Sequence, residues 1–336
     1  MKHIIIGGNG FVGRHLAHDL SALGEEVIVA DIERSDLAVY DKVRHIAIDV
    51  RDRATLDRIP LDSDDLVYNL SAKMLSPIQV RAKRYDFFWP VNFHGVENIL
   101  DWMASHDARK YVQYTTDMVY GHNTDLYTTE DAPRNPLGEY GKSKLATELL
   151  CEEWRTRGMN VSIFRPRLII GPGRLGILVK LFKLIDRNLP VPMIGSGANP
   201  YQFISVYDCS SACIAAWRHG VPNGTYNLGS EDPPPVKKLL GDLIKEAGSR
   251  SVLVPTPAPL VKATLALMDR ANVPLMDPEQ YLIADETCIR SIEAAKRDLD
   301  WTPRDRDQDM LNKAYREYRM LSERDGRSPS SASHAA

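Results

Sequence analysis

The stretch that most constrains the fold lies near the N-terminus, where an apolar run breaks into glycines and then continues as a helix. Residues 4–6 are three isoleucines, which favour a strand covered on both faces. Gly7, Gly10 and Gly13 leave room for a tight turn and for a pyrophosphate lying against backbone N–H groups. Apolar residues then recur at helical spacing over 16–20. This is the order that a dinucleotide site requires, although glycines alone can also mark a simple turn.

A second apolar strand is predicted over 27–31, and it ends in a carboxylate, Asp31, 18 residues after Gly13. A carboxylate there can accept hydrogen bonds from both hydroxyls of an adenosine ribose and would repel a 2′-phosphate. The pattern therefore favours NAD over NADP as cofactor, although the nearby Arg34 can soften that preference. An aspartate that merely caps a turn is the alternative interpretation.

Two further strands are predicted over 45–52 and 66–72. The first has acidic residues at its carboxyl end, the edge where α/β sheets collect ligands, and Asp49 there can reach an adenine amino group. The second ends in the small residues Ser71 and Ala72, which let the backbone approach a cofactor closely. Both strands therefore extend the predicted cofactor site.

A possible catalytic group follows the fifth predicted strand, 111–116, which ends in Thr116. A helix predicted over 140–154 places Tyr140 and Lys144 on one face, because they are four residues apart. Oxidising an alcohol with a nicotinamide requires a base near neutrality, and a free tyrosine is too basic by about three units of pKa. A lysine one turn away and the positive nicotinamide ring would lower the pKa of the phenol. The same spacing also occurs on many surface helices, but the motifs upstream favour catalysis.

Taken together, these features resemble the extended short-chain dehydrogenase/reductases, the NAD-dependent epimerase/dehydratase family, from residue 3 to about Tyr318. A predicted helix over 91–104 carries part of the likeness. The matching segments are the glycine loop, Tyr140-x-x-x-Lys144, Asp49-Val50-Arg51-Asp52, Val91-Asn92-x-x-Gly95-x-x-Asn98, Thr116-Asp117-Met118-Val119-Tyr120-Gly121, Arg165-Pro166, Gly171-Pro172-Gly173 and Tyr226-Asn227-Leu228-Gly229.

The resemblance implies an α/β fold in two parts. A Rossmann domain with a doubly wound parallel sheet is expected over 1–166, and a smaller C-terminal substrate-binding lobe over 167–324, from which 201–229 returns to the Rossmann domain. It also implies a homodimer joined through helices 92–106 and 141–157. The small polar residues of 325–336 predict a disordered tail.

By the same resemblance Tyr140 is the base, Lys144 positions the nicotinamide ribose and lowers the pKa of the tyrosine, and Thr116 holds the substrate hydroxyl. The candidate cofactor-binding residues are Gly7, Asn9, Gly10, Phe11, Val12, Gly13, Asp31, Asp49, Val50, Leu70, Ser71, Ala72, Asn92, Tyr140, Lys144, Arg165 and Pro166. The candidate substrate-binding residues are Lys73, Asp117, Met118, Arg167, Leu168, Arg174 and Tyr201.

Nucleotide-diphosphate sugars are the substrate class that the resemblance favours, yet three positions depart from the pattern of members that bind them. Leu168 replaces an asparagine that contacts the diphosphate, Tyr201 replaces an arginine, and Ser205 replaces a histidine. Losing a charge–phosphate contact costs on the order of 1.5–3 kcal/mol unless another group replaces it. Arg174 and Arg187 are candidate replacements.

Met118 narrows the choice of reaction by arguing against dehydration. It stands where sugar 4,6-dehydratases carry a glutamate that removes a proton, and a thioether cannot do acid–base chemistry. Epimerisation at C4 of a nucleotide-linked sugar is the first hypothesis. The apolar stretch 252–268 resembles 3β-hydroxysteroid dehydrogenase-like members, which keeps a dehydrogenase of an apolar alcohol as the alternative, although apolar helical stripes are usually core or a dimer contact. A regulatory protein that only binds the cofactor is the third.

Composition argues against several other classes. A formal net charge of −3 over 336 residues offers no basic face for nucleic acid. The four cysteines are scattered and form neither a C-x-x-C pair nor a metal-binding pattern with histidine, which predicts reduced thiols and no metal. No apolar run has the length of a signal peptide or a membrane span. We therefore expect a cytoplasmic enzyme with a small-molecule substrate.

Overall fold

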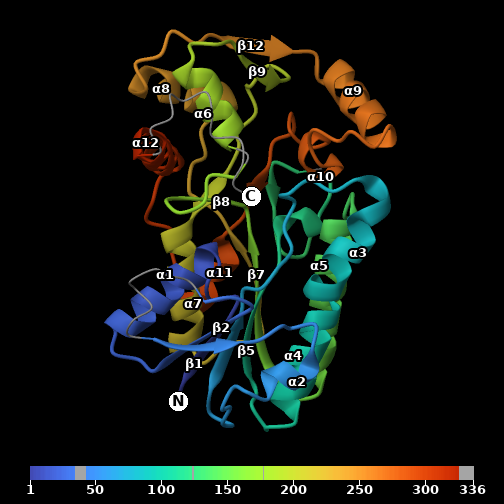
Figure 1. Cartoon of the computed structure of the whole chain (residues 1–336), viewed down its shortest axis with the longest axis vertical. Helices are drawn as coiled ribbons and strands as arrows, with labels where there is room; N and C mark the ends of the chain where they lie inside the picture. Colours follow the sequence, from blue (N-terminus) through green and yellow to red (C-terminus); the bar gives the residue numbers. More distant parts are fainter. Residues whose placement is uncertain (35–42, 123–124, 177, 325–336) are drawn as a thin grey trace.

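The computed structural model of the chain describes residues 1–34, 43–122, 125–176 and 178–324, so the predicted tail 325–336 lies outside the described residues. Its larger part is a seven-stranded sheet in the order β11-β7-β5-β4-β1-β2-β3, in which every neighbouring pair is parallel (Figure 1). The strands are β1 (His3–Ile6), β2 (Val27–Asp31), β3 (Arg44–Ala47), β4 (Leu66–Asn69), β5 (Lys110–Tyr114), β7 (Asn160–Pro166) and β11 (Thr225–Leu228). This order belongs to a doubly wound Rossmann sheet, and it confirms the predicted fold class.

Helices cover both faces of the sheet. One face carries α1 (Phe11–Ala22), α7 (Val206–Arg218) and α11 (Glu293–Leu299), and the other carries α2 (Arg53–Leu56), α4 (His94–Ala104) and α5 (Glu139–Thr156). Successive side chains of a strand point to opposite faces, so Ile5 joins the first core while Ile4 and Ile6 join the second. Burial on both sides explains why β1 is an apolar run without alternation.

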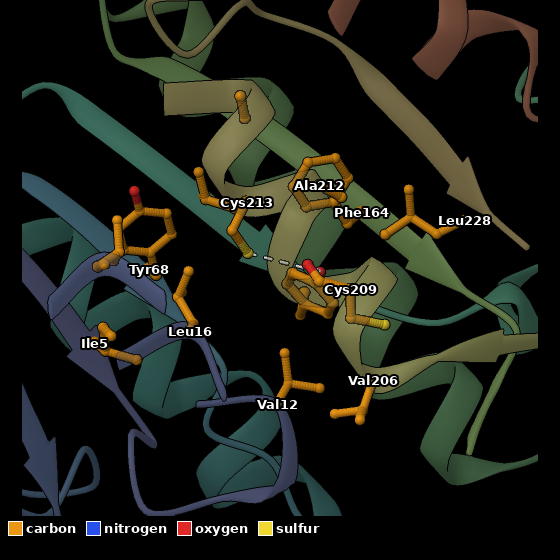
Figure 2. Packing of buried hydrophobic residues seen from close by; sticks show 14 of the residues in the cluster. Ile5, Val12, Leu16, Tyr68, Phe164, Val206, Cys209, Ala212, Cys213 and Leu228 are labelled. Atoms are coloured by element: carbon orange, nitrogen blue, oxygen red, sulfur yellow. Dashed lines mark hydrogen bonds between the residues drawn. The ribbon is translucent and has the colours of Figure 1, made fainter. Parts of the chain in front are cut away.

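Figure 2 shows the core on the first face, where α1 and α7 meet the sheet. The thiol of Cys213 in α7 donates to the hydroxyl of Tyr114 in β5 at 3.6 Å. Because β11 then pairs with β7, the chain completes the Rossmann sheet only after it has passed through part of the second lobe. The residues packed here include Val12, Leu16, Val206, Cys209, Ala212, Ile5, Tyr68, Phe164 and Leu228.

The C-terminal lobe is built from short parallel strand pairs and helices. The pairs are β8 (Leu168–Ile170) with β10 (Phe203–Ser205), β9 (Val191–Ile194) with β12 (Leu253–Thr256), and β6 (Tyr127–Thr128) with β13 (Ile289–Arg290). The helices are α6 (Leu178–Asp186), α8 (Val236–Glu246), α9 (Ala258–Arg270), α10 (Pro278–Tyr281) and α12 (Asp307–Arg324). A separate apolar core holds α6, α8 and α12 together around Phe182.

Several predicted elements differ from the observed ones. The strands predicted over 66–72 and 111–116 end earlier, at Asn69 and Tyr114, and two other elements differ more. The strand predicted over 45–52 ends at Ala47, because the N–H of Asp49 turns away to bond the hydroxyl of Thr55 at 2.9 Å. The helix predicted over 91–104 is two helices, α3 (Arg84–Asn92) and α4, which meet at Phe93. α3 also contains Pro90, a residue that normally marks a helix boundary because it lacks an N–H.

The apolar stretch 252–268 forms β12 and α9, and α9 lies at the edge of the lobe (Figure 1). Leu260 and Leu267 of this helix are 65% and 66% exposed. The interpretation of this helix as core is therefore wrong for these side chains, while a dimer contact stays a prediction. None of the helices in the described ranges has the length and apolarity needed to cross a membrane.

Phe182 tests whether the second core stabilises its own lobe. Its side chain is buried and packs on the rings of Tyr315 and Tyr318, with centroids 5.3 and 5.5 Å away. We expect Phe182→Ala to lower the free energy of unfolding by about 3–5 kcal/mol in urea titrations, because a large cavity forms. Leu267→Ala, at an exposed position, should change it by less than about 0.5 kcal/mol. Equal losses in the two variants would contradict this assignment.

Candidate active site

The loop between β1 and α1 packs directly on the end of β4. Gly7 has φ +77°, and a Cβ there would lie 2.5 Å from the backbone nitrogen of Ser71. A Cβ on Gly13 would lie 2.5 Å from the carbonyl oxygen of Gly7, so only hydrogen fits. α1 begins at Phe11, and its N-cap residue Gly10 has no side chain to cap the first turn. A helix N-terminus of this kind suits the oxygens of a pyrophosphate.

A cavity of about 410 Å³ opens beside this loop at the end of β2. Within it the carboxylate of Asp31 accepts hydrogen bonds from the backbone N–H groups of Asn9 at 2.9 Å and Ile32 at 2.8 Å. Burial raises the pKa of Asp31, and these two hydrogen bonds act against that rise. The side-chain oxygen of Asn9 is buried and has no hydrogen-bond partner among the described residues. The lining, which includes Glu33 and Arg34, thus fits the adenosine ribose of a dinucleotide.

Asp49 and Val50 lie in the turn between β3 and α2. Arg51 binds the Asp49 carboxylate at 2.6 Å and holds the pKa of that carboxyl below its usual value. Asn98 of α4 donates to the carbonyl of Val50 at 2.8 Å, and a Cβ on Gly95 would lie 2.7 Å from the Val50 side chain. Asn98 and Gly95 therefore hold this turn in place, whereas the Asp49 carboxylate already has a charged partner.

Asn92 is fully buried at the end of α3 and ties three segments together. Its side chain accepts from the N–H of Lys73 at 2.8 Å, and donates to the carbonyl of Lys73 at 3.0 Å and to the hydroxyl of Ser143 at 3.3 Å. Just upstream, Ser71 bonds the side chain of Asn69. The structure thus places Asn92 where it fixes the loop 70–73 against α5. That loop contains the candidate cofactor residues Leu70, Ser71 and Ala72.

Thr116, Tyr140 and Lys144 come together at the carboxyl end of β5 and the first turns of α5, and all three are buried. The hydroxyl groups of Tyr140 and Thr116 interact, and Tyr140 also donates to the sulfur of Met74 at 3.6 Å. The ammonium of Lys144 donates to the carbonyl of Tyr114 at 3.3 Å. This grouping provides a phenol, a hydroxyl and an amine near one point of the sheet edge.

Burial dominates the proton affinities of this group. It raises the pKa of Tyr140 above its usual range, the charge of Glu279 adds to the rise, and the Thr116 hydroxyl opposes it. Burial lowers the pKa of Lys144 to about 8, and the charge of Glu148 acts against this change. Lys144 is therefore mostly protonated at pH 7. Without a cofactor, Tyr140 keeps its proton at neutral pH. Its use as a base therefore requires a further positive charge nearby.

Arg165 lies in a buried ion network on β7. Its guanidinium bonds the carboxylate of Glu148 at 2.7 and 2.9 Å and the hydroxyl of Tyr120 at 2.7 Å. Arg134 also reaches Glu148, at 3.2 Å. The structure places Arg165 in the link between β7 and α5, and Pro166 in register with Leu228 of β11.

A second buried network surrounds Asp117. Arg167 reaches its carboxylate at 2.6 Å and Arg290 at 2.9 Å, so two guanidinium groups share one carboxylate. The Arg167 guanidinium also lies 4.6 Å from the centre of the Tyr201 ring, and its Nε and Nη2 have no hydrogen-bond partner in the described part of the chain. The three charged side chains are sealed from solvent directly after Thr116.

The remaining substrate candidates are spread around this edge. Met118 donates its N–H to the Thr116 hydroxyl at 3.2 Å, and Leu168 is half-buried in β8. The ammonium of Lys73 lies 5.4 Å from the centre of the Phe87 ring. Arg174 follows β8, and its charge reaches Tyr140, where it lowers the pKa of the phenol. Arg174 is therefore close enough to act on this site.

The sequence analysis missed three residues that touch these groups: Met74, Arg290 and Glu279. Arg290 lies in β13 and Glu279 in α10, far along the chain from Asp117 and Tyr140. No local spacing marks them. The described residues contain no group of three His, Cys, Asp or Glu side chains placed to hold a metal ion.

Comparisons with known proteins agree with this geometry. The model of the NAD dependent epimerase/dehydratase family matches residues 3–229. The uncharacterized protein y4nG of Sinorhizobium fredii is 30% identical over 318 residues, which cover 94% of this chain and 78% of that protein. A crystal structure of UDP-glucose 4-epimerase is 19% identical and superposes with a TM-score of 0.78 over 95% of this chain and 98% of that one. A crystal structure of UDP-glucuronic acid 4-epimerase from Bacillus cereus in complex with NAD is 20% identical. It superposes with a TM-score of 0.74 over 96% of this chain and 98% of that one.

Fold and site together define a dinucleotide-binding Rossmann protein with a Tyr–Lys pair beside the cofactor edge. The chain belongs to the NAD-dependent epimerase/dehydratase family, which confirms the resemblance seen in its sequence. It is an NAD-dependent enzyme of the extended short-chain dehydrogenase/reductase type.

Gly13 tests the cofactor loop. We expect Gly13→Ala to weaken NAD binding at least about tenfold in isothermal titration, because the added Cβ forces the loop away from α1. Gly241→Ala is the matched control. It lies in α8, where a Cβ would meet only a leucine methyl at 3.9 Å, so NAD affinity should stay unchanged and stability should rise by up to about 1 kcal/mol. Full NAD affinity in Gly13→Ala would contradict the assignment.

Proposed function

We propose that this chain epimerises a secondary hydroxyl, at C4 of a nucleotide-linked sugar, by oxidising it with bound NAD and then reducing the ketone from the opposite face. The observation that carries the proposal is the convergence of Thr116, Tyr140 and Lys144 beside the glycine loop. When bound, NAD supplies the hydride acceptor and a positive ring. The chain would hold it through Gly7, Gly13 and Asp31, whose contacts fit the pyrophosphate and the ribose.

The proton balance assigns a role to each residue of the trio. Tyr140 as phenolate takes the hydroxyl proton while the carbon-bound hydrogen leaves as hydride, and it returns the proton when the ketone is reduced. Since burial raises the pKa of this phenol, the proposal relies on the protonated Lys144 and the nicotinamide charge to favour the phenolate. Thr116 would hold the substrate oxygen beside the Tyr140 hydroxyl.

Dehydration has no supporting group in the described structure. The side chain at position 118 is a thioether, and the neighbouring Asp117 has its carboxylate bound by two arginines. This supports reversible oxidation without loss of water.

A dehydrogenase of an apolar alcohol is the second candidate, and the apolar helix α9 is the feature that suggested it. The leucines of that helix face solvent. Side chains exposed to this extent do not form a closed pocket for an apolar substrate. Both Arg174 and Arg187 are exposed. We propose the diphosphate contact at Arg174, because its charge reaches Tyr140, and not at Arg187 beyond α6.

Tyr140 carries the main test of the proposed reaction. We expect Tyr140→Phe to lower kcat with UDP-sugars by a factor of about 10²–10⁴ while the purified protein still releases NAD on denaturation. Lys142→Met, on the outward side of the same helix turn, should keep both the wild-type kcat and the bound NAD. Turnover of added NAD with apolar alcohols, in a protein that emerges without cofactor, would favour the second candidate instead.

We further propose a homodimer joined through α4 and α5, which lie side by side on one face of the sheet (Figure 1). Leu149 of α5 supports this, because it is a large apolar residue that is 50% exposed. We expect Leu149→Glu to convert a dimer into a monomer in light-scattering measurements, since two carboxylates would meet near a two-fold axis. Leu23→Glu, an equally exposed leucine on α1's C-terminal side, should stay dimeric. A monomeric wild-type chain would end the proposal.

A further inference from the structure

A carboxylate from the C-terminal lobe caps the helix that carries the proposed base. Glu279 of α10 is 1% exposed, and its two oxygens accept the backbone N–H of Gly141 at 3.0 and 2.9 Å. The N-cap residue of α5 is Gly138, which has no side chain of its own for this purpose. The first turn of the helix, which contains Tyr140, is therefore capped by a residue 138 positions further along the chain.

Two glycines make room for this carboxylate. A Cβ on Gly138 would lie 2.5 Å from one oxygen of Glu279, and a Cβ on Gly141 would lie 2.8 Å from the other. Around Gly138 the three nearest atoms all belong to Glu279. Glycine therefore stands at both positions, 138 and 141, where a side chain would collide with the Glu279 carboxylate.

The segment that carries Glu279 is itself held against the Rossmann domain. Asp277 accepts the N–H of Glu279 at 3.0 Å and so caps α10. Arg84 of α3 pairs with Asp277 at 3.4 Å and bonds Asp269 of α9 through both terminal nitrogens. These contacts leave Glu279 little freedom to move away from α5.

The carboxylate and the phenol also act on each other electrostatically. Burial raises the pKa of Glu279 to about 8; the N–H groups of Gly141 and Tyr140 oppose the rise, and the charges of Asp277 and Glu139 add to it. Above about pH 8, where Glu279 is mainly ionised, its charge disfavours a negative charge on the nearby phenol and so raises the pKa of Tyr140.

Other groups also face the phenol. The charge of Asp117 raises the pKa of Tyr140 as well, whereas Thr116 and Arg174 lower it. Met74 and the ring of Phe88 complete the surroundings.

We propose that Glu279 is a positioning residue for Tyr140: from the opposite lobe its carboxylate fixes the first turn of α5 and places its charge near the phenol. This inference rests on the proposed function for the role of Tyr140 as base. It assigns the C-terminal lobe a part in orienting the base in addition to binding the substrate.

The test follows Tyr140 directly in the NAD-loaded protein, by NMR of tyrosines labelled with ¹³C at Cζ. The signal of Tyr140 is the one that Tyr140→Phe removes. In Glu279→Gln the amide oxygen can still accept from Gly141 but the charge is gone, so the pKa of Tyr140 should fall below that of the wild type. Gly138→Ala, which displaces the carboxylate without altering it, should shift the pKa in the same direction.

Steady-state rates supply the second measurement. The phenolate is the active form in oxidation, so activity is lost as pH falls through the pKa of Tyr140. Because Glu279 is ionised only above its own pKa of about 8, we expect Glu279→Gln to move this acidic limb of kcat to lower pH when the limb lies above about pH 8, and to leave a limb below about pH 8 in place. Glu279→Ala, which also loses the cap, should reduce kcat on the order of tenfold with KM little changed. Asp186→Asn is the control, because this carboxylate accepts the hydroxyl of Tyr315 in the second core; it should alter thermal stability but neither the NMR pKa of Tyr140 nor the limb.

The outcomes separate the two proposals. An unchanged Tyr140 pKa in both Glu279→Gln and Gly138→Ala overturns the role of Glu279, whatever the activity. If these variants shift the pKa of Tyr140 but the wild-type protein turns over no UDP-sugar, the coupling between Glu279 and Tyr140 stands and the proposed function is wrong.

Discussion

The parallel pairing of β1 with its neighbours β2 and β4 is the interaction on which the rest of this molecule depends. Parallel strands end at a common edge, so the pairing brings the glycine loop, Asp31 and the turn at Ser71 to one place. The close contact between Gly7 and Ser71 is possible only because no Cβ intervenes. The cofactor edge is thus a consequence of strand order together with three missing side chains.

Buried charges connect that sheet to the second lobe. Arg290 in β13 reaches Asp117 at the end of β5, and Arg84 in α3 holds Asp269 and Asp277. Such pairs add little net stability because desolvation of the charges offsets their attraction. Removing one partner is costly, however, since the other charge is left buried. These networks therefore specify where the C-terminal lobe sits relative to the end of β5.

The interior of the site opposes the role of base that we propose for Tyr140. Burial raises the pKa of Tyr140 and lowers that of Lys144, so both groups are pushed toward their neutral forms. In the proposed mechanism the positive charge of a bound nicotinamide would offset this effect on Tyr140. The protonation of Tyr140 would thus depend on the charge of the cofactor as well as on the protein.

Much of the fold was predictable from the sequence, because its signals are local. The apolar run of β1, the glycines and the Tyr140–Lys144 spacing depend on geometry within a few residues, and the structure has the predicted Rossmann sheet. Boundaries were less accurate: β3 ends at Ala47, and the helix predicted from Val91 begins at Arg84 and breaks at Phe93. Hydrogen bonds to residues elsewhere decide such ends.

Long-range partners were not predictable. Asn92 and Arg165 stand in family motifs that suggested cofactor contacts, yet the structure engages them with Lys73 and Glu148. By itself the sequence determined the sheet, the glycine loop and the shared face of Tyr140 and Lys144, because strand and helix periods fix those relations. Only the tertiary structure brought Glu279 to Gly141 and Arg290 to Asp117, since residues so far apart meet only when the two lobes pack together.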